Sequence, residues 1–293
     1  MKVYLAPDTT SRGIMRVVDA LTRYAPPSIQ VVGTPQEAEF EVIHVWGRHD
    51  SVEKRVEALR KSGKPYAMIQ YVLRSSMRPH TKDWIKMWEG SRVVWSYYHL
   101  PHIADQDLVD GDFNFYYAPL GVDTDVFDIT THVTGGNKRY VVLATSQHAL
   151  AEGTRECAFA TKEVGRKMLF IGHELRRGPD IVCKANLTDQ ELAWDYSACQ
   201  YVSGLRRVEG FEFPVIEGAM CGARPIVFDR SEMRQWFNDF AIFINEGPRE
   251  EVIKTLVEIF KNPAKEINER EKNIIRDRFN WSRIINGFWK EVI

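Results

Sequence analysis

Short apolar runs alternate along the chain with longer segments whose apolar residues recur at helical spacing. Residues 3–6, 40–45 and 66–69 are compact apolar runs, which are typical of buried β-strands. After the first run, a loop that ends in Gly13 leads into residues 14–21, whose apolar positions fall on one helical face. Strand, glycine-containing loop and helix in this order indicate the opening unit of a Rossmann-like domain with a parallel sheet.

The same pattern resumes in the second half of the chain and indicates another α/β domain. Its predicted strands are at residues 138–144, 167–171, 200–203 and 226–228. The helix predicted at 188–199 begins with Thr188, and Glu191 follows three residues later, which predicts a capping box. Residues 248–260 predict an amphipathic helix.

Composition and charge are those of an ordinary globular protein. Of its 293 residues, 44% are hydrophobic and 27% are charged, and the formal net charge of −1 argues against nucleic acid as a partner. Its four cysteines are widely spaced without a C-x-x-C pair, which predicts reduced, mostly buried thiols and a cytoplasmic location. No apolar run approaches the length that spans a bilayer, and the first run is too short for a signal peptide.

A basic stretch at residues 48–92 leaves two interpretations open. Lys and Arg outnumber acidic residues there, and Trp84, Trp88 and Trp95 are interleaved with them. This combination is typical of a face that meets an anionic membrane, so a peripheral membrane contact is one prediction. The alternative is a pair of solvated helices whose tryptophans pack into the core.

The segment that begins at Glu209 carries the most informative chemistry. Glu209 lies in a glycine-containing loop, and Glu217 follows eight positions later, about one turn into a helix that Pro214 is suited to begin. Gly222 predicts the end of that helix. A helix N-terminus suits a phosphate, and carboxylates beside it suit the hydroxyls of a sugar or a ribose. The alternative is a loop, helix and strand with surface glutamates.

This segment resembles the Glu-x7-Glu motif of the retaining GT-B glycosyltransferases (glycosyl transferases group 1). Residues 116–127 resemble the family's phrase Pro-x-Gly-Val-Asp-x-x-x-Phe, and residues 187–199 resemble its phrase Ser-Asp-Glu-Glu-Leu followed by Tyr-x-x-Ala. The resemblance implies an α/β chain with two Rossmann-like domains facing across a cleft and a C-terminal helix that crosses back to the N-terminal domain. Residues 274–293 resemble the closing helix of the family, so one helix is expected there. We place an acceptor-side domain at 1–128, a nucleotide-sugar-binding domain at 138–278 and the closing helix that packs toward the N-terminal domain at 279–293.

The resemblance also implies the residues of a site. Glu209 would contact the donor-sugar hydroxyls and is the catalytic assignment, whereas Glu217 would bind the ribose hydroxyls of the donor. Gly172, at the end of a strand, is also placed on the donor side. Backbone groups around the donor would come from Gly210, Phe211, Glu212 and Phe213. Gly13 and Gln70 are placed on the acceptor side, and Gln70 stands where the family commonly has His.

The diphosphate-binding half of the site departs from the family. Relatives show an Arg and then a Lys after the first strand of the second domain. This chain lacks that Arg, and Glu152 stands where the Lys would be. The hydroxyls of Thr145 and Ser146 and a helix N-terminus remain as phosphate ligands. The candidate replacement cations are Arg155, Lys184, Arg206 and Arg207.

The activity implied is a retaining transfer of a sugar from a UDP- or GDP-linked donor to an acceptor hydroxyl on a glycan, lipid or protein. Neither a cofactor nor a metal is expected. Asp-x-Asp pairs do occur at 105/107, 110/112 and 123/125, but Asp is also common in turns. The missing Arg and Lys favour an alternative, a non-catalytic nucleotide- or sugar-binding module on the same scaffold. A membrane-surface scaffold that uses the basic stretch is a third hypothesis.

Overall fold

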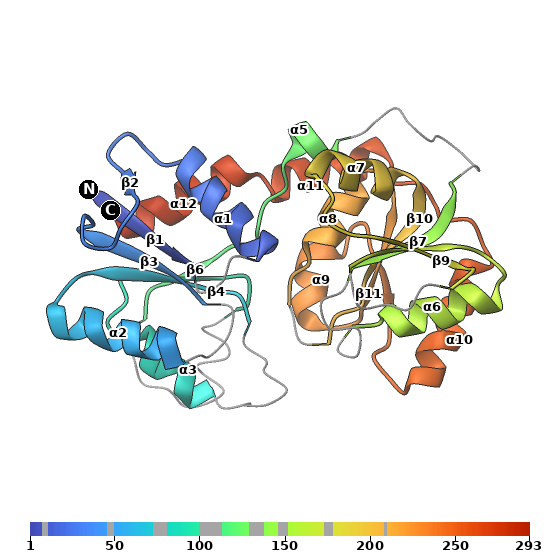
Figure 1. Ribbon diagram of the computed structural model, residues 1–293, viewed down its shortest axis with the longest axis horizontal. Coiled ribbons are helices and arrows are strands. Elements are labelled where there is room, and N and C mark those ends of the chain that lie inside the picture. Colours follow the sequence, from blue (N-terminus) through green and yellow to red (C-terminus); the bar gives the residue numbers. More distant parts are fainter. Residues whose placement is uncertain are drawn as a thin grey trace. The chain divides into compact units, whose positions relative to one another are not determined.

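The chain divides into two compact units (Figure 1). The computed structural model describes residues 1–7, 11–45, 50–72, 81–99, 113–128, 138–145, 152–172, 178–207 and 210–293. Unit 1 comprises Met1–Gly121, Val208–Gly210 and Asn280–Ile293, and unit 2 comprises Val122–Arg207 and Phe211–Phe279. The chain therefore returns to unit 1 at its C-terminal end.

Unit 1 contains a six-stranded parallel sheet with the order β2-β1-β3-β4-β5-β6. Its strands are β1 (Lys2–Pro7), β2 (Gln30–Val32), β3 (Phe40–Val45), β4 (Tyr66–Gln70), β5 (Val94–Ser96) and β6 (Phe115–Tyr117). Its described helices are α1 (Arg12–Arg23), α2 (Asp50–Ser62), α3 (Thr81–Trp88) and α12 (Trp281–Val292). The first five strands follow the order of doubly wound, flavodoxin-like sheets.

The apolar runs of the sequence form the centre of this first sheet. Every residue of β3 and β4 is buried, as expected for a parallel sheet that is covered on both faces. Helix α12 packs on the unit through Phe288, whose ring lies 5.4 Å from that of Trp95. The Tyr116 hydroxyl donates to the Ile284 carbonyl at 2.7 Å. Gly287 permits this contact, because a Cβ there would collide with the Tyr116 ring.

Unit 2 contains a second six-stranded parallel sheet, in the order β12-β11-β10-β7-β8-β9. Its strands are β7 (Tyr140–Thr145), β8 (Met168–Ile171), β9 (Ile181–Lys184), β10 (Cys199–Gly204), β11 (Arg224–Phe228) and β12 (Ile242–Ile244). Its described helices are α5 (Thr124–Phe127), α6 (Thr154–Glu163), α7 (Asp189–Ser197), α8 (Phe213–Met220), α9 (Ser231–Phe237), α10 (Arg249–Phe260) and α11 (Glu269–Arg278). This is the strand order of the Rossmann fold, so the winding of the sheet reverses between β7 and β10.

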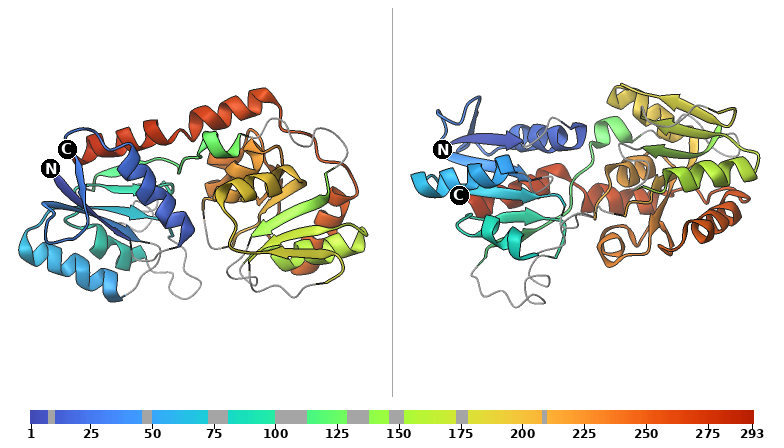
Figure 2. Two further views of the ribbon diagram at one scale, coloured as in Figure 1. Left: turned by 45° about the horizontal axis from the view of Figure 1, so that its top comes forward. Right: turned by 60° about the horizontal axis from the view of Figure 1, so that its bottom comes forward.

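Helices cover both faces of the second sheet (Figures 1 and 2). On one face, α6 and α10 pack against each other and over Tyr201 of β10. On the other face, α8 packs on β10 and β11, and Gly218 lies so close that a Cβ would stand 2.6 Å from a methyl group of Val202. Tyr201 and Val202 thus point to opposite faces, as the alternation along a strand requires.

Local sequence signals position α7 and α8. The predicted capping box is confirmed, because the Glu191 N–H donates to Thr188 Oγ1 at 3.2 Å and the Thr188 N–H donates to Glu191 Oε2 at 2.7 Å. Helix α8 has Pro214 in its first turn and ends before Gly222, whose φ is 84°. This left-handed conformation ends the helix as predicted, and a side chain there would introduce strain.

The expectation of one closing helix over residues 274–293 is wrong. The chain instead forms α11 and then α12, with a break at Phe279 and Asn280. The Asn280 side chain accepts from the Arg283 N–H at 3.0 Å and caps the new helix. A short polar side chain that bonds to the nearby backbone competes with helix continuation. The break coincides with the change from unit 2 to unit 1.

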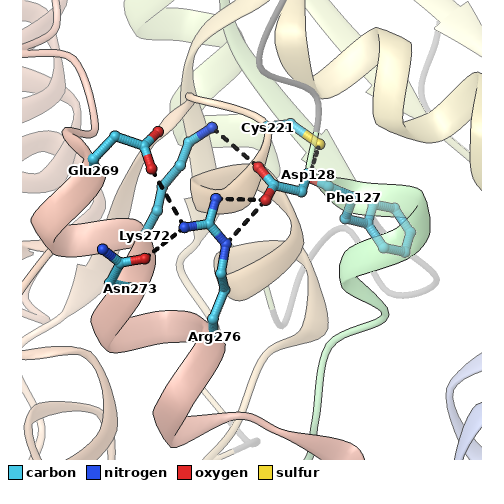
Figure 3. A network of polar contacts seen from close by, with 7 residues as sticks. All are labelled: Phe127, Asp128, Cys221, Glu269, Lys272, Asn273 and Arg276. Carbon is cyan, nitrogen blue, oxygen red and sulfur yellow. Dashed lines mark hydrogen bonds and ion pairs between the residues drawn. The ribbon is translucent and has the colours of Figure 1, made fainter.

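A charged network within unit 2 joins the end of α5 to α11 (Figure 3). Asp128 accepts a hydrogen bond from Arg276 Nε at 2.9 Å and lies 3.4 Å from Lys272 Nζ. Nearby, the Val122 N–H donates to the Phe279 carbonyl at 2.9 Å. The segment that enters unit 2 is thereby tied to the segment that leaves it.

Candidate functional site

Charged side chains gather at the carboxyl ends of neighbouring strands in unit 2. Thr145 is the last residue of β7, and Arg206 and Arg230 each lie two positions beyond the ends of β10 and β11. Because the winding reverses between β7 and β10, this is the edge at which open α/β sheets bind ligands. The charged group consists of Glu152, Glu156, Glu212, Glu246, Arg206, Arg207 and Arg230.

Arg206 bridges the ends of β7 and β10. Its Nη2 donates to Thr145 Oγ1 at 2.9 Å, and its Nε donates to Glu212 Oε2 at 3.0 Å. Its Nη1 pairs with Glu152, the residue that stands in place of the family's Lys. Arg206 is only 9% exposed. This predicted cation therefore lies at the expected edge of the sheet, but two buried carboxylates already neutralise its charge.

Arg230 belongs to the same group, and the sequence analysis did not find it. Its side chain is 7% exposed, and its Nη1 donates to the Arg206 carbonyl at 2.9 Å. Its Nε and Nη2 are buried without a hydrogen-bond partner among the described residues. The sequence did contain one signal for Arg230, its position two residues after the apolar run at 226–228, where a predicted strand ends.

Glu246 lies between two guanidinium groups and was also missed. Its Oε2 is 3.9 Å from Arg230 Nε, and its Oε1 is 3.9 Å from Arg207 Nε. On its other side, Arg207 Nη2 donates to Glu156 Oε1 at 2.9 Å. The Arg207 guanidinium also lies over the ring of Phe228, 5.0 Å from its centroid.

Glu217 is buried inside unit 2. It lies in α8 and is 2% exposed, and its Oε2 accepts a hydrogen bond from the Tyr196 hydroxyl of α7 at 3.2 Å. Since Tyr196 is fully buried, this contact fixes the orientation of the carboxylate. Glu209, the catalytic assignment, and Ser146 both lie outside the described residues. Of the two glutamates of the Glu-x7-Glu pattern, the structure therefore describes only Glu217.

The other predicted donor-side residues near α8 have different surroundings. Phe211 packs in an aromatic cluster, with its ring 5.3 Å from that of Phe237 and 5.8 Å from that of Phe279. The side chain is therefore part of the core, and the donor-side role predicted for Phe211 concerns its backbone. Phe213 is the first residue of α8. Gly210 groups with unit 1, where a Cβ on it would collide with an aromatic ring.

The remaining donor-side candidates do not join the group around Arg206. Lys184 Nζ lies 2.6 Å from Asp195 Oδ1, so that cation has its own carboxylate. Arg155 is exposed in the first turn of α6, and Gly172 follows β8 with a φ of 155°. Among the described residues, neither Lys184 nor Arg155 bonds to the charged group at the carboxyl ends of β7, β10 and β11.

The two acceptor-side candidates lie in unit 1. Gly13 is in the first turn of α1, directly after the loop that follows β1. Gln70 ends β4 and is fully buried. Its Nε2 donates to the Val72 carbonyl at 2.7 Å, and its Oε1 accepts from Trp88 Nε1 at 3.3 Å. Both ends of the amide are thus engaged within the unit, and Gln70 holds the end of the strand in place.

His44 lies on β3, the strand next to that of Gln70, one position before its carboxyl end and opposite Ile69 of β4. Its Nδ1 is 2.7 Å from the Tyr71 hydroxyl, and its Nε2 has no hydrogen-bond partner among the described residues. Burial lowers the pKa of His44 to about 3. The imidazole is therefore neutral throughout the physiological pH range.

The basic stretch contributes to the core and to internal ion pairs. All three of its tryptophans are buried in unit 1: Trp84, Trp88 and Trp95. Arg55 lies 2.6 Å and Lys64 lies 3.3 Å from oxygens of Glu41, which is 2% exposed. The interpretation that these tryptophans pack into the core is confirmed, with Trp84 and Trp88 in α3 and Trp95 in the strand β5. Residues 48–49 and 73–80 of the stretch lie outside the described chain.

No helix in the described residues is long and apolar enough to cross a membrane. Within the same residues, no three His, Cys, Asp or Glu side chains come together as a metal-binding group. Asp123 instead caps α5 by accepting from the Asp125 N–H at 3.2 Å, and the Asp-x-Asp pairs at 105/107 and 110/112 lie outside the described ranges. None of the four cysteines forms a disulfide, and three of them are buried.

Comparison with known proteins gives matches to solved structures. No family model matches the chain, and a search of curated proteins also found no match. HepE of Anabaena in complex with UDP aligns with a TM-score of 0.73 at 10% identity, over 100% of this chain and 99% of that one. Sucrose-phosphate synthase from Thermosynechococcus elongatus aligns with a TM-score of 0.70 at 11% identity, over 99% of this chain and 98% of that one.

Another match covers only part of the length of the matched protein. The pneumococcal O-GlcNAc transferase GtfA, in complex with UDP and GlcNAc, aligns with a TM-score of 0.67 at 12% identity over 86% of this chain. This chain spans 56% of the length of GtfA. The matches to HepE and sucrose-phosphate synthase extend over almost the whole of both chains and so include both units of this chain, which has the GT-B fold that the sequence resemblance implied.

Proposed function

We propose that this chain is a glycosyltransferase that moves a sugar from a UDP- or GDP-linked donor to an acceptor hydroxyl, with retention of configuration and without a metal. Glu217 carries the proposal, because a carboxylate of the Glu-x7-Glu pattern is buried in the Rossmann-like unit and oriented by Tyr196. The GT-B fold supports it, since HepE and GtfA are glycosyltransferase-like structures described with UDP.

The role of Glu217 is to receive the ribose hydroxyls of the donor. An ionised carboxylate accepts hydrogen bonds on two oxygens, which matches the two neighbouring hydroxyls of a ribose. Hydrogen bonds to a charged group are stronger than those between neutral groups. The Tyr196 hydroxyl fixes the orientation of the carboxylate before the nucleotide arrives, which lowers the entropy lost on binding.

The transfer itself needs few side chains. Glu209 contacts the hydroxyls of the donor sugar, and backbone N–H groups of residues 210–213 face the leaving diphosphate, where negative charge develops. The bond between the sugar and the phosphate oxygen breaks as the acceptor oxygen bonds to the sugar. The acceptor proton passes to the departing phosphate oxygen, so no protein nucleophile is required. Whether the acceptor is a glycan, a lipid or a protein is for transfer assays to decide.

Calorimetric titration with UDP and GDP tests the binding half of the proposal. Glu217→Gln should weaken the preferred nucleotide by about tenfold or more, because it removes hydrogen bonds to a charged group. Tyr196→Phe should have a smaller effect in the same direction. Glu258→Gln, at an exposed glutamate paired with Lys261, is the matched control and should change nothing. Failure of both nucleotides to bind at millimolar concentration would rule the proposal out.

Donor hydrolysis and sugar transfer test the catalytic half. Glu209→Gln should abolish turnover while the affinity for UDP or GDP stays nearly the same. If the variant turns over at the normal rate, Glu209 has no catalytic role.

A second candidate is a non-catalytic nucleotide- or sugar-binding module. The observation that favours it is the pairing of Arg206 with Glu152 and Glu212, because two carboxylates then balance the charge that Arg206 would offer to a diphosphate. Tight nucleotide binding without donor hydrolysis or transfer, tested across donors and acceptors, would select this candidate.

A further inference from the structure

The winding of the second sheet reverses between β7 and β10, and charged side chains gather at this edge. Which of these cations could bind a phosphate depends on the carboxylates that already pair with them. Arg206 and Lys184 each have a carboxylate within hydrogen-bond distance, so neither offers a net positive charge. Arg207 also has a carboxylate partner, Glu156 at 2.9 Å, but Arg207 and Arg230 both turn an Nε toward Glu246 at 3.9 Å. That distance lies beyond a hydrogen bond, so the carboxylate balances charge without satisfying either N–H.

We propose that Arg207 and Arg230 form a phosphate-binding site at the carboxyl ends of β10 and β11, which the Glu246 carboxylate covers when no ligand is bound. The burial of Arg230 is the first observation behind the proposal. A guanidinium that is 7% exposed with two unpartnered donor atoms is unfavourable in a folded protein unless something else satisfies it. An oxyanion supplies the acceptors that the described residues do not.

The second observation is that both arginines are oriented before any ligand binds. Arg207 is held by Glu156 at 2.9 Å and by the ring of Phe228. Arg230 is held through its Nη1 by the Arg206 carbonyl at 2.9 Å. Each keeps its Nε edge toward the same carboxylate. Guanidinium groups fixed in this way suit a phosphate, which can accept from two of them at once.

The third observation is that Glu246 can leave. It follows the end of β12, and its side chain is 37% exposed, so water can solvate the carboxylate after it turns outward. A phosphate carries more charge and more acceptor oxygens than a carboxylate. It can therefore replace Glu246 and come within hydrogen-bond distance of both arginines.

This inference rests on the proposed function for the source of the phosphate. The phosphate group belongs either to the donor diphosphate or to an acceptor. Titrations with UDP and uridine separate the two sources. Arg230→Gln should weaken UDP and leave uridine unchanged if the donor diphosphate occupies the site. If an acceptor phosphate occupies it, inorganic phosphate should bind together with UDP, and Arg230→Gln should weaken the phosphate alone.

The direct test is a calorimetric titration of the full chain with inorganic phosphate. Arg230→Gln should weaken binding by about tenfold or more, because it removes charge-assisted hydrogen bonds. Glu246→Gln should do the opposite and strengthen binding severalfold, because it removes the competing charge. Arg249→Gln is the control, since Arg249 lies over the ring of Phe159 outside the site. Equal affinity in all variants, absence of phosphate binding, or weaker binding by Glu246→Gln would overturn the proposal.

The outcomes for the two proposals can be told apart. If neither UDP nor GDP binds but phosphate binding responds to Arg230→Gln and Glu246→Gln as expected, the phosphate site stands and the transferase proposal fails. If UDP binding depends on Glu217 but is indifferent to Arg230 and Glu246, and phosphate does not bind, the transferase proposal stands and the phosphate site fails.

Discussion

The carboxyl edges of the two sheets have the same architecture and different chemistry. In unit 1 the strand ends carry neutral side chains, His44, Gln70 and Ser96. In unit 2 the corresponding edge carries guanidinium groups and carboxylates, including Arg206 and Arg230. Both sheets are six-stranded and parallel, so the fold does not decide which edge binds a charged ligand. The side chains at the strand ends decide it.

The two edges also differ in which of their buried polar atoms lack a hydrogen-bond partner. Gln70 uses both ends of its amide within unit 1, and Ser96 Oγ donates to the Gln70 carbonyl at 3.1 Å while it accepts from the Tyr98 N–H. Among the described residues, the neutral His44 Nε2 lacks a hydrogen-bond partner in unit 1, whereas in unit 2 the charged Arg230 has two buried donor atoms without one. A buried charged group without a partner is far more costly than a neutral one, so the edge of unit 2 is the one that indicates a ligand.

Removal of Arg206 should give the largest effect on stability. Arg206→Leu leaves Glu152 and Glu212 buried without their cation and should cost about 3–5 kcal/mol. Gln70→Leu, the neutral counterpart in unit 1, should cost about 1–3 kcal/mol. Hydrogen exchange measures each unit separately and shows whether β7 and β10 lose protection in the first variant and β4 in the second.

A double variant provides the control for this comparison. Arg206→Leu combined with Glu212→Leu removes one of the stranded carboxylates and should recover part of the loss. If Arg206→Leu costs no more than Gln70→Leu, the charged edge contributes no more to stability than the neutral one.

The pH dependence should separate the units next. The pKa of His44 is about 3 when folded and lies near 6.5 in the unfolded chain. The unfolded state therefore binds a proton that the folded state does not, so the stability of unit 1 is complete above pH 6.5 and falls as the pH decreases toward 3. Well below pH 6.5 the slope approaches about 1.4 kcal/mol per pH unit, and the loss between pH 6.5 and 4.5 is about 2 kcal/mol.

Exchange protection in β3, measured at pH 6.5 and 4.5, reports this loss. His44→Gln retains a polar partner for Tyr71 and removes the titrating group, so its unit 1 should lose less stability over the same range. An identical pH dependence in the variant would assign the effect to other groups.

Much of the fold could be predicted from the sequence because its strands are buried on both faces. Such strands appear as continuous apolar runs, and those at 40–45 and 66–69 were predicted within one residue of their bounds. Strand β9 was missed, since its four residues are all half-buried at the edge of the sheet. The break before α12 was missed because Asn280 is one short side chain within an otherwise helical pattern.

The site was predictable only where residues follow one another in a pattern. Glu217 and its helix could be placed from the spacing of Pro214 and Gly222. The contacts of Arg230 with Arg206 and Glu246 join three strands that are distant in sequence. Such contacts depend on the order of the strands in the sheet, which local spacing does not contain.

The smallest predicted effects on stability are larger at the edge of unit 1 than at the edge of unit 2, the reverse of the order expected for Arg206 and Gln70. Ser96 is 2% exposed, so Ser96→Ala leaves two buried backbone groups without a partner and should cost about 1–2 kcal/mol. Thr145 is half-buried, and water can replace its hydroxyl beside Arg206, so Thr145→Val should cost about 0.5–1 kcal/mol.

Nucleotide affinity should show the opposite ranking in the same two variants. Thr145→Val should weaken UDP by about threefold, the value of one modest hydrogen bond, whereas Ser96→Ala should leave UDP binding unchanged. This pattern would show that the edge of unit 1 contributes to the stability of the fold and the edge of unit 2 to the binding of the ligand. If Ser96→Ala weakens UDP as much as Thr145→Val does, the two edges do not divide these roles, and the chemistry of the strand ends is not what distinguishes the units.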